Sequence, residues 1–113
     1  MMNKRPSPWE IWWAIVKFED DPTQSKRRPV LVVSDKTAFI ISLKITHHEP
    51  RAEFDGEYRV IRWQESGLTQ PSTIRYSKKL KLFESDFVGQ IGKLHPTDIR
   101  NLRVMLAEII KRQ

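Results

Sequence analysis

The apolar run VLVVS at residues 30–34 and the basic stretch directly before it constrain the fold of this chain most strongly. Three valines in five residues predict a buried β-strand. Lys26, Arg27 and Arg28 end an irregular segment, and Pro29 fixes the backbone where the strand begins. We therefore expect positive charge held at the end of a rigid strand, where it can face an anionic ligand.

The composition indicates one small domain with an acidic partner. With 113 residues, 39% of them apolar, the chain can bury a single core, and the lack of cysteine excludes disulfides and thiolate metal sites. A net charge of +6 favours nucleic acid, a membrane surface or an acidic protein as the partner. The apolar runs are too short for a membrane span, and the start lacks a signal peptide core, so we expect no membrane association and a cytoplasmic location.

The order of the elements predicts many short strands followed by a helix. We expect a flexible N-terminal segment at residues 1–8 and a single domain at residues 9–113. The first strand should have both faces covered, as in a closed barrel or at a subunit interface. A short helix should begin at an N-cap formed by Ser85 or Asp86 and run to about Ile91, with Gly92 as its stop. The expected strands lie at residues 10–18, 30–34, 38–46, 58–63, 72–76 and 80–83.

Strict alternation makes the third strand the most informative one. Apolar residues at 39, 41, 43 and 45 share one face, and the other face places Ser42, Lys44 and Thr46 together at the strand's end. We expect these three polar side chains to point outward.

The last element is an amphipathic helix that should pack on the sheet. Pro96 suits a first helical turn, Asp98 favours the positive end of the helix, and Arg112 favours the negative end. The predicted fold class is therefore mainly β with a C-terminal helix, in a small, strongly bent antiparallel sheet or barrel. The apolar stripe consists of Ile99, Leu102, Leu106, Ile109 and Ile110.

Cations are the main candidates for a functional site. A metal site is hard to build from three histidines, two of which are adjacent, so we expect no metal and no cofactor. The cations either line one groove or form a solvated surface. Those outside the first basic stretch are Lys44, Arg59, Arg62, Arg75, Lys78, Lys79 and Lys81.

Aromatic residues interleave with these cations, a pattern that suits stacked single-stranded bases. For Trp12 and Trp13 we favour a place in the core or at a dimer interface. On RNA, attack by a ribose 2′-hydroxyl on the adjacent phosphate requires charge on the phosphoryl oxygens, a proton acceptor and a proton donor. An arginine and a threonine can supply much of this chemistry.

Five blocks of the sequence, in this order, resemble the MazF/PemK family of toxins from bacterial toxin–antitoxin pairs. The resemblance covers nearly the whole chain from about Trp9 onward. The blocks are EIWWAIVKFEDDP, SKRRPVLVVSD, KITHH, GLTQPSTIR and FVGQIGKLHPTDIRNL.

The resemblance implies a small SH3-like antiparallel barrel that forms a homodimer. It also implies a sequence-specific, ribosome-independent and metal-independent endoribonuclease that cuts single-stranded RNA to 2′,3′-cyclic phosphate and 5′-hydroxyl ends. A cognate antitoxin protein would inhibit it. The same fold serves a relative that poisons DNA gyrase, so a non-catalytic module that binds nucleic acid or a protein target is the alternative.

Carried over to this chain, the family's catalytic arginine falls on Arg28 and its threonine on Thr46. Lys44 is a competing alignment for the threonine, but a lysine does not replace the hydroxyl. Many relatives carry a glutamate in the loop before the arginine, whereas residues 21–25 here read DPTQS. Either a nearby acid among Glu19, Asp20 and Asp21 substitutes as the base, or the base lies elsewhere.

The remaining site residues are expected to bind RNA. His47 and His48 could also act as acid or base, because an imidazole titrates near neutrality. The expected RNA-binding residues are Lys26, Arg27, Lys44, His47, His48 and Arg75.

Overall fold

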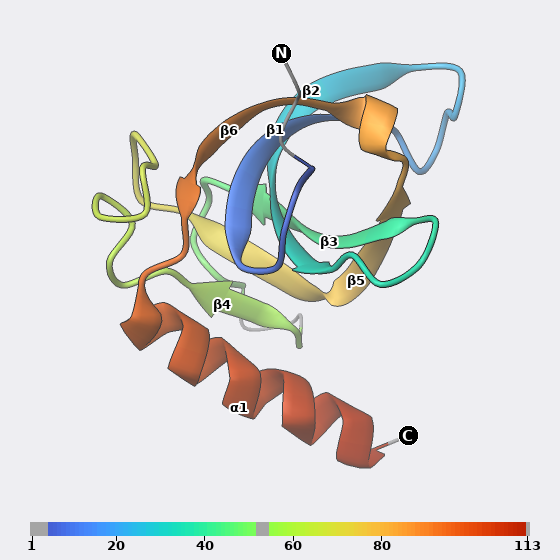
Figure 1. Ribbon diagram of the computed structural model, residues 1–113. Helices are drawn as coiled ribbons and strands as arrows, with labels where there is room; N and C mark the ends of the chain where they lie inside the picture. Colours follow the sequence, from blue (N-terminus) through green and yellow to red (C-terminus); the bar gives the residue numbers. More distant parts are fainter. Residues whose placement is uncertain (1–4, 52–54, 113) are drawn as a thin grey trace.

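The computed structural model describes residues 5–51 and 55–112, the last four of them by their backbone alone. One six-stranded antiparallel sheet, in the order β4-β5-β3-β2-β1-β6, curls into a barrel-like form, and a single long helix lies outside it beside β4 (Figure 1). The elements are β1 (Glu10–Lys17), β2 (Ser25–Ser34), β3 (Ile40–Thr46), β4 (Glu57–Arg59), β5 (Thr73–Leu82), a 3₁₀ turn η1 (Glu84–Asp86), β6 (Phe87–Lys93) and α1 (Pro96–Arg112). The predicted mainly β fold with a C-terminal helix is confirmed.

The largest buried apolar cluster joins the sheet to α1. Alternate residues of the central strands meet apolar side chains of the helix there, as the period-two patterns predict. Leu102 of the helix is fully buried, and Ile99 and Leu106 pack against the same cluster; the side chains of residues 109 and 110 lie outside the described part. The buried members are Ile11, Leu31, Leu43, Ile45, Tyr58, Val60, Leu68, Ile74, Leu94 and Leu102.

Asp98 fixes the start of α1 to the segment that follows β4. Its carboxylate is fully buried and accepts hydrogen bonds from the Tyr58 hydroxyl (2.5 Å) and from the backbone N–H groups of Ile61 (2.8 Å) and Arg62 (2.9 Å). A buried carboxylate is tolerable only when donors of this kind surround it. The helix is thereby held at one angle to the sheet.

Two close backbone approaches bring the loop after β4 against the end of β6. A Cβ atom added to Gly92 would lie 2.2 Å from the Ser66 carbonyl oxygen, and one added to Gly67 would lie 2.7 Å from the Ile91 carbonyl oxygen. Gly67 also has a φ of +91°. Glycine is therefore required at both positions, and the two ends of the curled sheet are packed together here.

The second strand begins earlier than predicted. β2 starts at Ser25, so Lys26, Arg27 and Arg28 belong to the strand and do not end an irregular segment. They pair with Val16, Ile15 and Ala14 of β1. The long apolar β1 supplies hydrogen-bond partners to a stretch whose own side chains have little strand preference, so pairing overrides local propensity.

The predicted short helix at residues 86–91 is wrong. Residues 87–93 form β6, which pairs with β1, and Asp86 instead closes η1 by accepting a hydrogen bond from the Phe83 N–H (2.9 Å). The capping signal at Ser85 and Asp86 therefore belongs to a single turn. Phe87, Val88 and Ile91 have the β preference that pairing with β1 completes.

The two strands predicted at residues 72–76 and 80–83 are one strand, β5, with an irregularity in the middle. Leu43 of β3 pairs with Lys79, but the next residue, Lys44, pairs with Arg75. The bulged segment instead donates hydrogen bonds to the carbonyl oxygen of Gly56, the residue just before β4 (2.7 and 3.3 Å). The residues of β5 that this bulge leaves without a partner on β3 are Tyr76, Ser77 and Lys78.

Three smaller expectations also change. β4 ends at Arg59, so the predicted strand at residues 58–63 is shorter. From Trp13 onward only one face of β1 is covered in the single chain, since Trp13 and Ile15 are each 38% exposed, whereas Ile11 on the same face is fully buried. Ser42 is fully buried and does not point outward, because the curled sheet covers both faces of β3 at that level.

The extent of the flexible N-terminal segment stays a prediction. Residues 1–4 lie outside the described part, while Arg5 pairs with Glu84 of η1 (2.8 Å) and Pro6 is buried.

Candidate functional site

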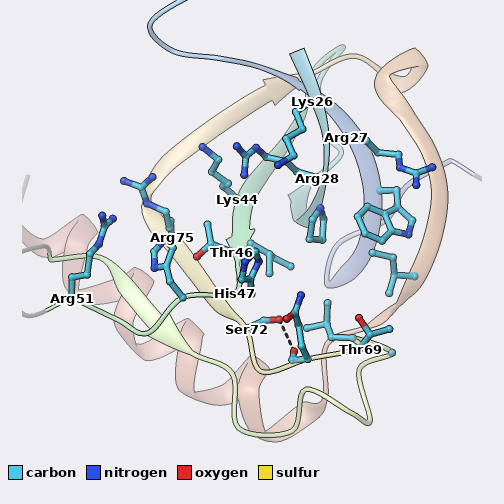
Figure 2. A pocket seen from close by; sticks show the side chains of 18 residues that line it. Lys26, Arg27, Arg28, Lys44, Thr46, His47, Arg51, Thr69, Ser72 and Arg75 are labelled. Atoms are coloured by element: carbon cyan, nitrogen blue, oxygen red, sulfur yellow. Dashed lines mark hydrogen bonds between the residues drawn. The ribbon is translucent and has the colours of Figure 1, made fainter. Parts of the chain in front are cut away.

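A cavity of about 590 Å³ opens at the end of the sheet where β2 begins and β3 finishes (Figure 2). Side chains from β1, β2, β3 and β5 and from the loops after β3 and β4 line it. Among the described residues, no carboxylate lines this cavity. Its charged lining residues are Lys26, Arg27, Arg28, Lys44, Arg51 and Arg75, and we call it the cationic pocket.

Strand geometry divides the basic stretch of β2. Successive side chains on a strand point to opposite faces, so Arg27 points away from its neighbours Lys26 and Arg28. The Arg27 guanidinium lies over the Trp13 ring, 5.1 Å from its centroid. Figure 2 shows Lys26 and Arg28 extending toward Lys44 and Arg27 lying on the other side. Pro29 follows at the pocket lining and pairs with Trp13 across the ladder.

Lys44 occupies the middle of the pocket. It lies opposite Val30 on β2 and opposite Arg75 on β5. Partial burial, with the nearby Arg28 and Arg75 charges, lowers the pKa of its ammonium group below the usual value. Cations brought together in this way repel one another, so the pocket is arranged for an anion at a cost in stability.

Thr46 lies one alternation further along β3 and also lines the pocket. Its Oγ1 atom is buried and has no hydrogen-bond partner among the described residues. An unsatisfied buried hydroxyl is uncommon in folded proteins, so Thr46 keeps an unused hydrogen-bond donor at the pocket wall.

The two histidines follow directly on the loop after β3, and both line the pocket with exposed side chains. Two side chains of the sheet hold the backbone of this loop in place. The His48 carbonyl oxygen accepts hydrogen bonds from Thr73 Oγ1 (2.6 Å) and from Arg59 Nη1 (3.3 Å). Figure 2 shows His47 next to Thr46 in the pocket. The loop thus places an imidazole beside the cations.

The acidic residues before β2 are engaged elsewhere. Both carboxylate oxygens of Glu19 lie 2.9 Å from Lys78 Nζ, and this hydrogen-bonded ion pair lowers the pKa of Glu19. Asp21 accepts hydrogen bonds from the backbone N–H and the hydroxyl of Thr23, which closes the turn. Of the acids weighed as bases, Glu19 is the one whose charge acts on Lys44 and Arg75.

Most of the cations of residues 59–81 do not reach the pocket, so for them the solvated surface, and not the single groove, is the alternative that agrees with the structure. Arg59 pairs with Glu49 (3.0 Å), Arg62 pairs with Glu65 (2.5 Å), and Lys78 pairs with Glu19. Lys79 and Lys81 lie on β5 and are exposed outside the cavity. Arg75 is the member of this group that lines it.

A comparison with protein families gives one match, to the PemK-like, MazF-like toxins of type II toxin–antitoxin systems, over residues 7–110. The chain belongs to this family. No curated protein matches it.

Solved structures of MazF toxins share this fold. The Mycobacterium tuberculosis toxin MazF-mt6 has 20% sequence identity and a TM-score of 0.68, over 90% of this chain and 96% of the other. A MazE–MazF structure from Deinococcus radiodurans has 15% identity and a TM-score of 0.69, over 98% and 100%. An endoribonuclease from a mycobacterial species has 14% identity and a TM-score of 0.68, over 96% and 93%. The small barrel expected from the family resemblance is confirmed.

All eight residues selected from the sequence line the cationic pocket of this MazF-family chain. Arg28 and Thr46 come from neighbouring strands, and β5 brings in Arg75. The RNA-binding candidates that join them are Lys26, Arg27, Lys44, His47 and His48.

Sequence reasoning missed several lining residues. Arg51 was read as part of a charged loop, and Trp13 was expected in the core or at a dimer interface, although Trp12, its neighbour, is indeed in the core at 7% exposure. Arg51 gave a usable signal, since it follows the histidines closely. Loop residues such as Thr69 and Gln70 gave none, because their place depends on how the segment after β4 returns to the sheet.

Among residues 5–51 and 55–112, no three histidine, aspartate or glutamate side chains come close enough to hold a metal ion. No helix in the described chain is long and apolar enough to cross a membrane.

Proposed function

We propose that this MazF-family chain is a sequence-specific endoribonuclease that cuts single-stranded RNA, independently of the ribosome, to 2′,3′-cyclic phosphate and 5′-hydroxyl ends. The observation that carries this proposal is the cationic pocket, which joins Arg28 and the unsatisfied hydroxyl of Thr46 in one cavity. Six cations and no described carboxylate in the lining suit a polyanionic strand.

The reaction is an internal transfer at phosphorus. The ribose 2′-oxygen loses its proton and bonds to the adjacent phosphorus, and the bond from phosphorus to the 5′-oxygen breaks. Arg28 stabilises the charge on the phosphoryl oxygens and donates a proton to the departing 5′-oxygen, while Thr46 donates a hydrogen bond to the phosphate. Every step uses side-chain groups, so we propose that it proceeds without a metal ion or cofactor.

The proton acceptor is either a pocket histidine or Glu19. His47 lines the pocket, whereas Glu19 is bound to Lys78 and its lowered pKa makes it a weaker base. Two substitutions separate these candidates. If His47 is the base, cleavage is lost in His47→Gln and persists in Glu19→Gln, and the reverse holds if Glu19 is the base.

The remaining residues hold the strand. Lys26, Arg27, Lys44 and Arg75 bind backbone phosphates, and His48 extends this surface at its rim. Because an unpaired strand follows a charged groove more readily than a stiff duplex enters it, single-stranded RNA is the proposed substrate.

We further propose that a cognate antitoxin covers the pocket in the cytoplasm, and that the toxin is a homodimer. The similar Deinococcus structure contains MazE with MazF, which supports a partner of this kind. An acidic, partly disordered antitoxin segment would neutralise the cations it covers. The exposed Trp13 and Ile15 on β1 are apolar surface that a second subunit or the antitoxin can bury.

One observation favours the alternative, a toxin-like module that binds nucleic acid or a protein such as gyrase without cutting. The described pocket lining lacks the carboxylate that many relatives carry, and a binding module needs no base. Both functions predict RNA binding or target binding, but only one predicts new RNA ends.

The decisive experiment incubates the purified protein with mixed-sequence RNA in EDTA and maps the ends formed. We expect cyclic phosphate ends, a loss of rate of about a hundred- to a thousandfold in Arg28→Ala, and an unchanged rate in the control Arg62→Ala, whose side chain pairs with Glu65 away from the pocket. Intact RNA in every sequence context, or full activity in Arg28→Ala, would refute the nuclease.

A further inference from the structure

The carboxylate of Glu57 lies behind one wall of the cationic pocket. Glu57, the first residue of β4, has a side chain that is only 2% exposed, and it does not itself line the cavity. Its Oε1 accepts a hydrogen bond from the backbone N–H of Arg51 (2.8 Å), and its Oε2 accepts one from Arg51 Nη2 (2.9 Å). Oε2 also lies 3.5 Å from Arg75 Nε, an ion pair without a hydrogen bond between the two atoms.

Glu57 therefore joins two arginines that reach the pocket from different segments. Arg51 follows the histidine loop, while Arg75 is the direct cross-strand partner of Glu57 on β5. Figure 2 shows the two guanidinium groups at the same end of the pocket. Glu57 is thus one fixed point that sets the place of both.

A buried carboxylate is stable only if cations and N–H donors compensate for the water it has lost. The hydrogen bonds from Arg51 lower the pKa of Glu57, so it stays ionised at neutral pH. A guanidinium carries five N–H donors in a rigid plane, and an edge bound to a carboxylate fixes the direction of the others. An arginine held in this way loses less entropy when it binds a phosphate.

We infer that Glu57 is a positioning residue, which orients Arg51 and Arg75 so that both bind backbone phosphates of the RNA. This inference rests on the proposed function. It adds Arg51 to the binding surface and gives a role to an acid that never touches the substrate.

The direction in which the RNA affinity of a Glu57 variant changes distinguishes a positioning role from a simple effect of net charge. Glu57→Gln raises the formal net charge from +6 to +7 and keeps the shape of the side chain. If only total charge mattered, RNA would bind more tightly. If Glu57 orients Arg51 and Arg75, its replacement instead weakens RNA binding. The matched control is Glu49→Gln, which changes the net charge equally but removes an 80% exposed carboxylate that pairs with Arg59 outside the pocket.

The test measures binding of a fluorescent mixed-sequence oligonucleotide with 2′-O-methyl riboses, which cannot undergo the cleavage reaction. We expect Glu57→Gln to bind about tenfold more weakly and Glu49→Gln to bind at least as tightly as the unsubstituted protein. The slope of log K against log salt should fall by about 0.7 for each phosphate that an arginine no longer neutralises, which a purely structural defect in a fraction of the protein would not change.

A second variant tests whether misfolding, and not lost orientation, causes the weaker binding of Glu57→Gln. Glu57→Asp keeps the charge and the net +6 but is one methylene too short to hold both arginines, so it should also bind weakly while its thermal unfolding stays cooperative. In cleavage, both variants should raise KM with a much smaller change in kcat.

The outcomes distinguish this inference from the nuclease itself. If the protein cuts RNA while Glu57→Gln and Glu57→Asp bind as tightly as the unsubstituted protein, the positioning role is wrong and the nuclease stands. If the variants lose binding in a protein that cuts no RNA, the positioning role stands and the nuclease is wrong. Tighter binding by Glu57→Gln overturns the inference outright.

Discussion

Lys44 on β3 is the direct cross-strand partner of Arg75 on β5, so two cations face each other across the sheet at the centre of the pocket. Like charges in directly opposed positions destabilise a sheet. The arrangement is therefore explained by binding and not by folding, and it yields the first of four predictions.

Replacing Lys44 should stabilise the protein and lower its affinity for RNA. The lowered pKa of Lys44 means that its charged form is less favourable in the folded than in the unfolded state, and this penalty is fully present below the folded-state pKa and disappears above about 10.5. In Lys44→Met we expect the melting temperature to rise by about 3 °C and RNA binding to weaken about tenfold. The control Lys79→Met, at an exposed position of β5, should change neither quantity, and a lower melting temperature in Lys44→Met would contradict the argument.

Trp13 should contribute a stacking surface for an RNA base. Its ring is 38% exposed at the pocket and lies under the Arg27 guanidinium. Removal of a stacking ring weakens single-strand binding by about 1–3 kcal/mol, so Trp13→Ala should bind RNA at least fivefold more weakly, and Trp13→Phe should restore most of the loss. Ile15→Ala is the control, because Ile15 is equally exposed on β1 but does not line the pocket. Equal losses in the two alanine variants would argue against stacking.

The glycines of β6 should differ sharply in their tolerance of alanine. At Gly92 the added methyl would overlap the Ser66 carbonyl, whereas at Gly89 it would meet no atom within 4 Å. Gly92→Ala should lower the free energy of unfolding by about 1–3 kcal/mol, and Gly89→Ala by no more than about 0.5 kcal/mol. Urea unfolding of the two variants side by side measures the difference, and similar midpoints would show that the loop after β4 can move away.

The dependence of folding stability on alkaline pH should report the ionisation of Tyr58. Burial, with the hydrogen bond to Asp98, raises the pKa of Tyr58 from 10.0 to about 12. Because the folded-state pKa is the higher one, the stability it contributes is complete below pH 10 and is lost as the pH rises through about 12. Tyr58→Phe should lose about 1 kcal/mol at neutral pH and then show a flatter decline of stability between these pH values than the unsubstituted protein. Tyr76→Phe serves as the comparison and should keep the original decline.

The site was more predictable from the sequence than the elements that carry it. Arg28, Thr46 and the cations around them were selected because alternation placed Thr46 at a polar strand end and because the sequence blocks resemble the MazF family. The pocket brings all of them together. Alternation is a local property, so it survives errors in the assignment of neighbouring elements.

Pairing between distant strands could not be predicted in the same way. Residues 87–93 carry a helix-capping signal before them, yet they form β6 because β1 offers a free edge. Likewise, Lys26, Arg27 and Arg28 became part of β2 through their partners on β1. In both places a long-range contact, invisible in a local window, decided the structure.

Glu57 illustrates the same limit at the site. In the sequence it is one acid in a charged loop, and nothing there distinguishes it from Glu49. Only the pairing of β4 with β5 places Glu57 opposite Arg75 and beneath the pocket wall.

The number of residues in the β5 bulge determines which face of the sheet the preceding side chains occupy. Tyr76, Ser77 and Lys78 are an odd number of extra residues, so they exchange the two faces of the strand for everything that precedes them. Deleting one of them would turn Ile74 toward the cationic pocket and Arg75 toward the apolar core. Deleting two would leave both side chains on their present faces of the sheet. Natural or engineered length changes here should therefore come in pairs, whatever residues they contain.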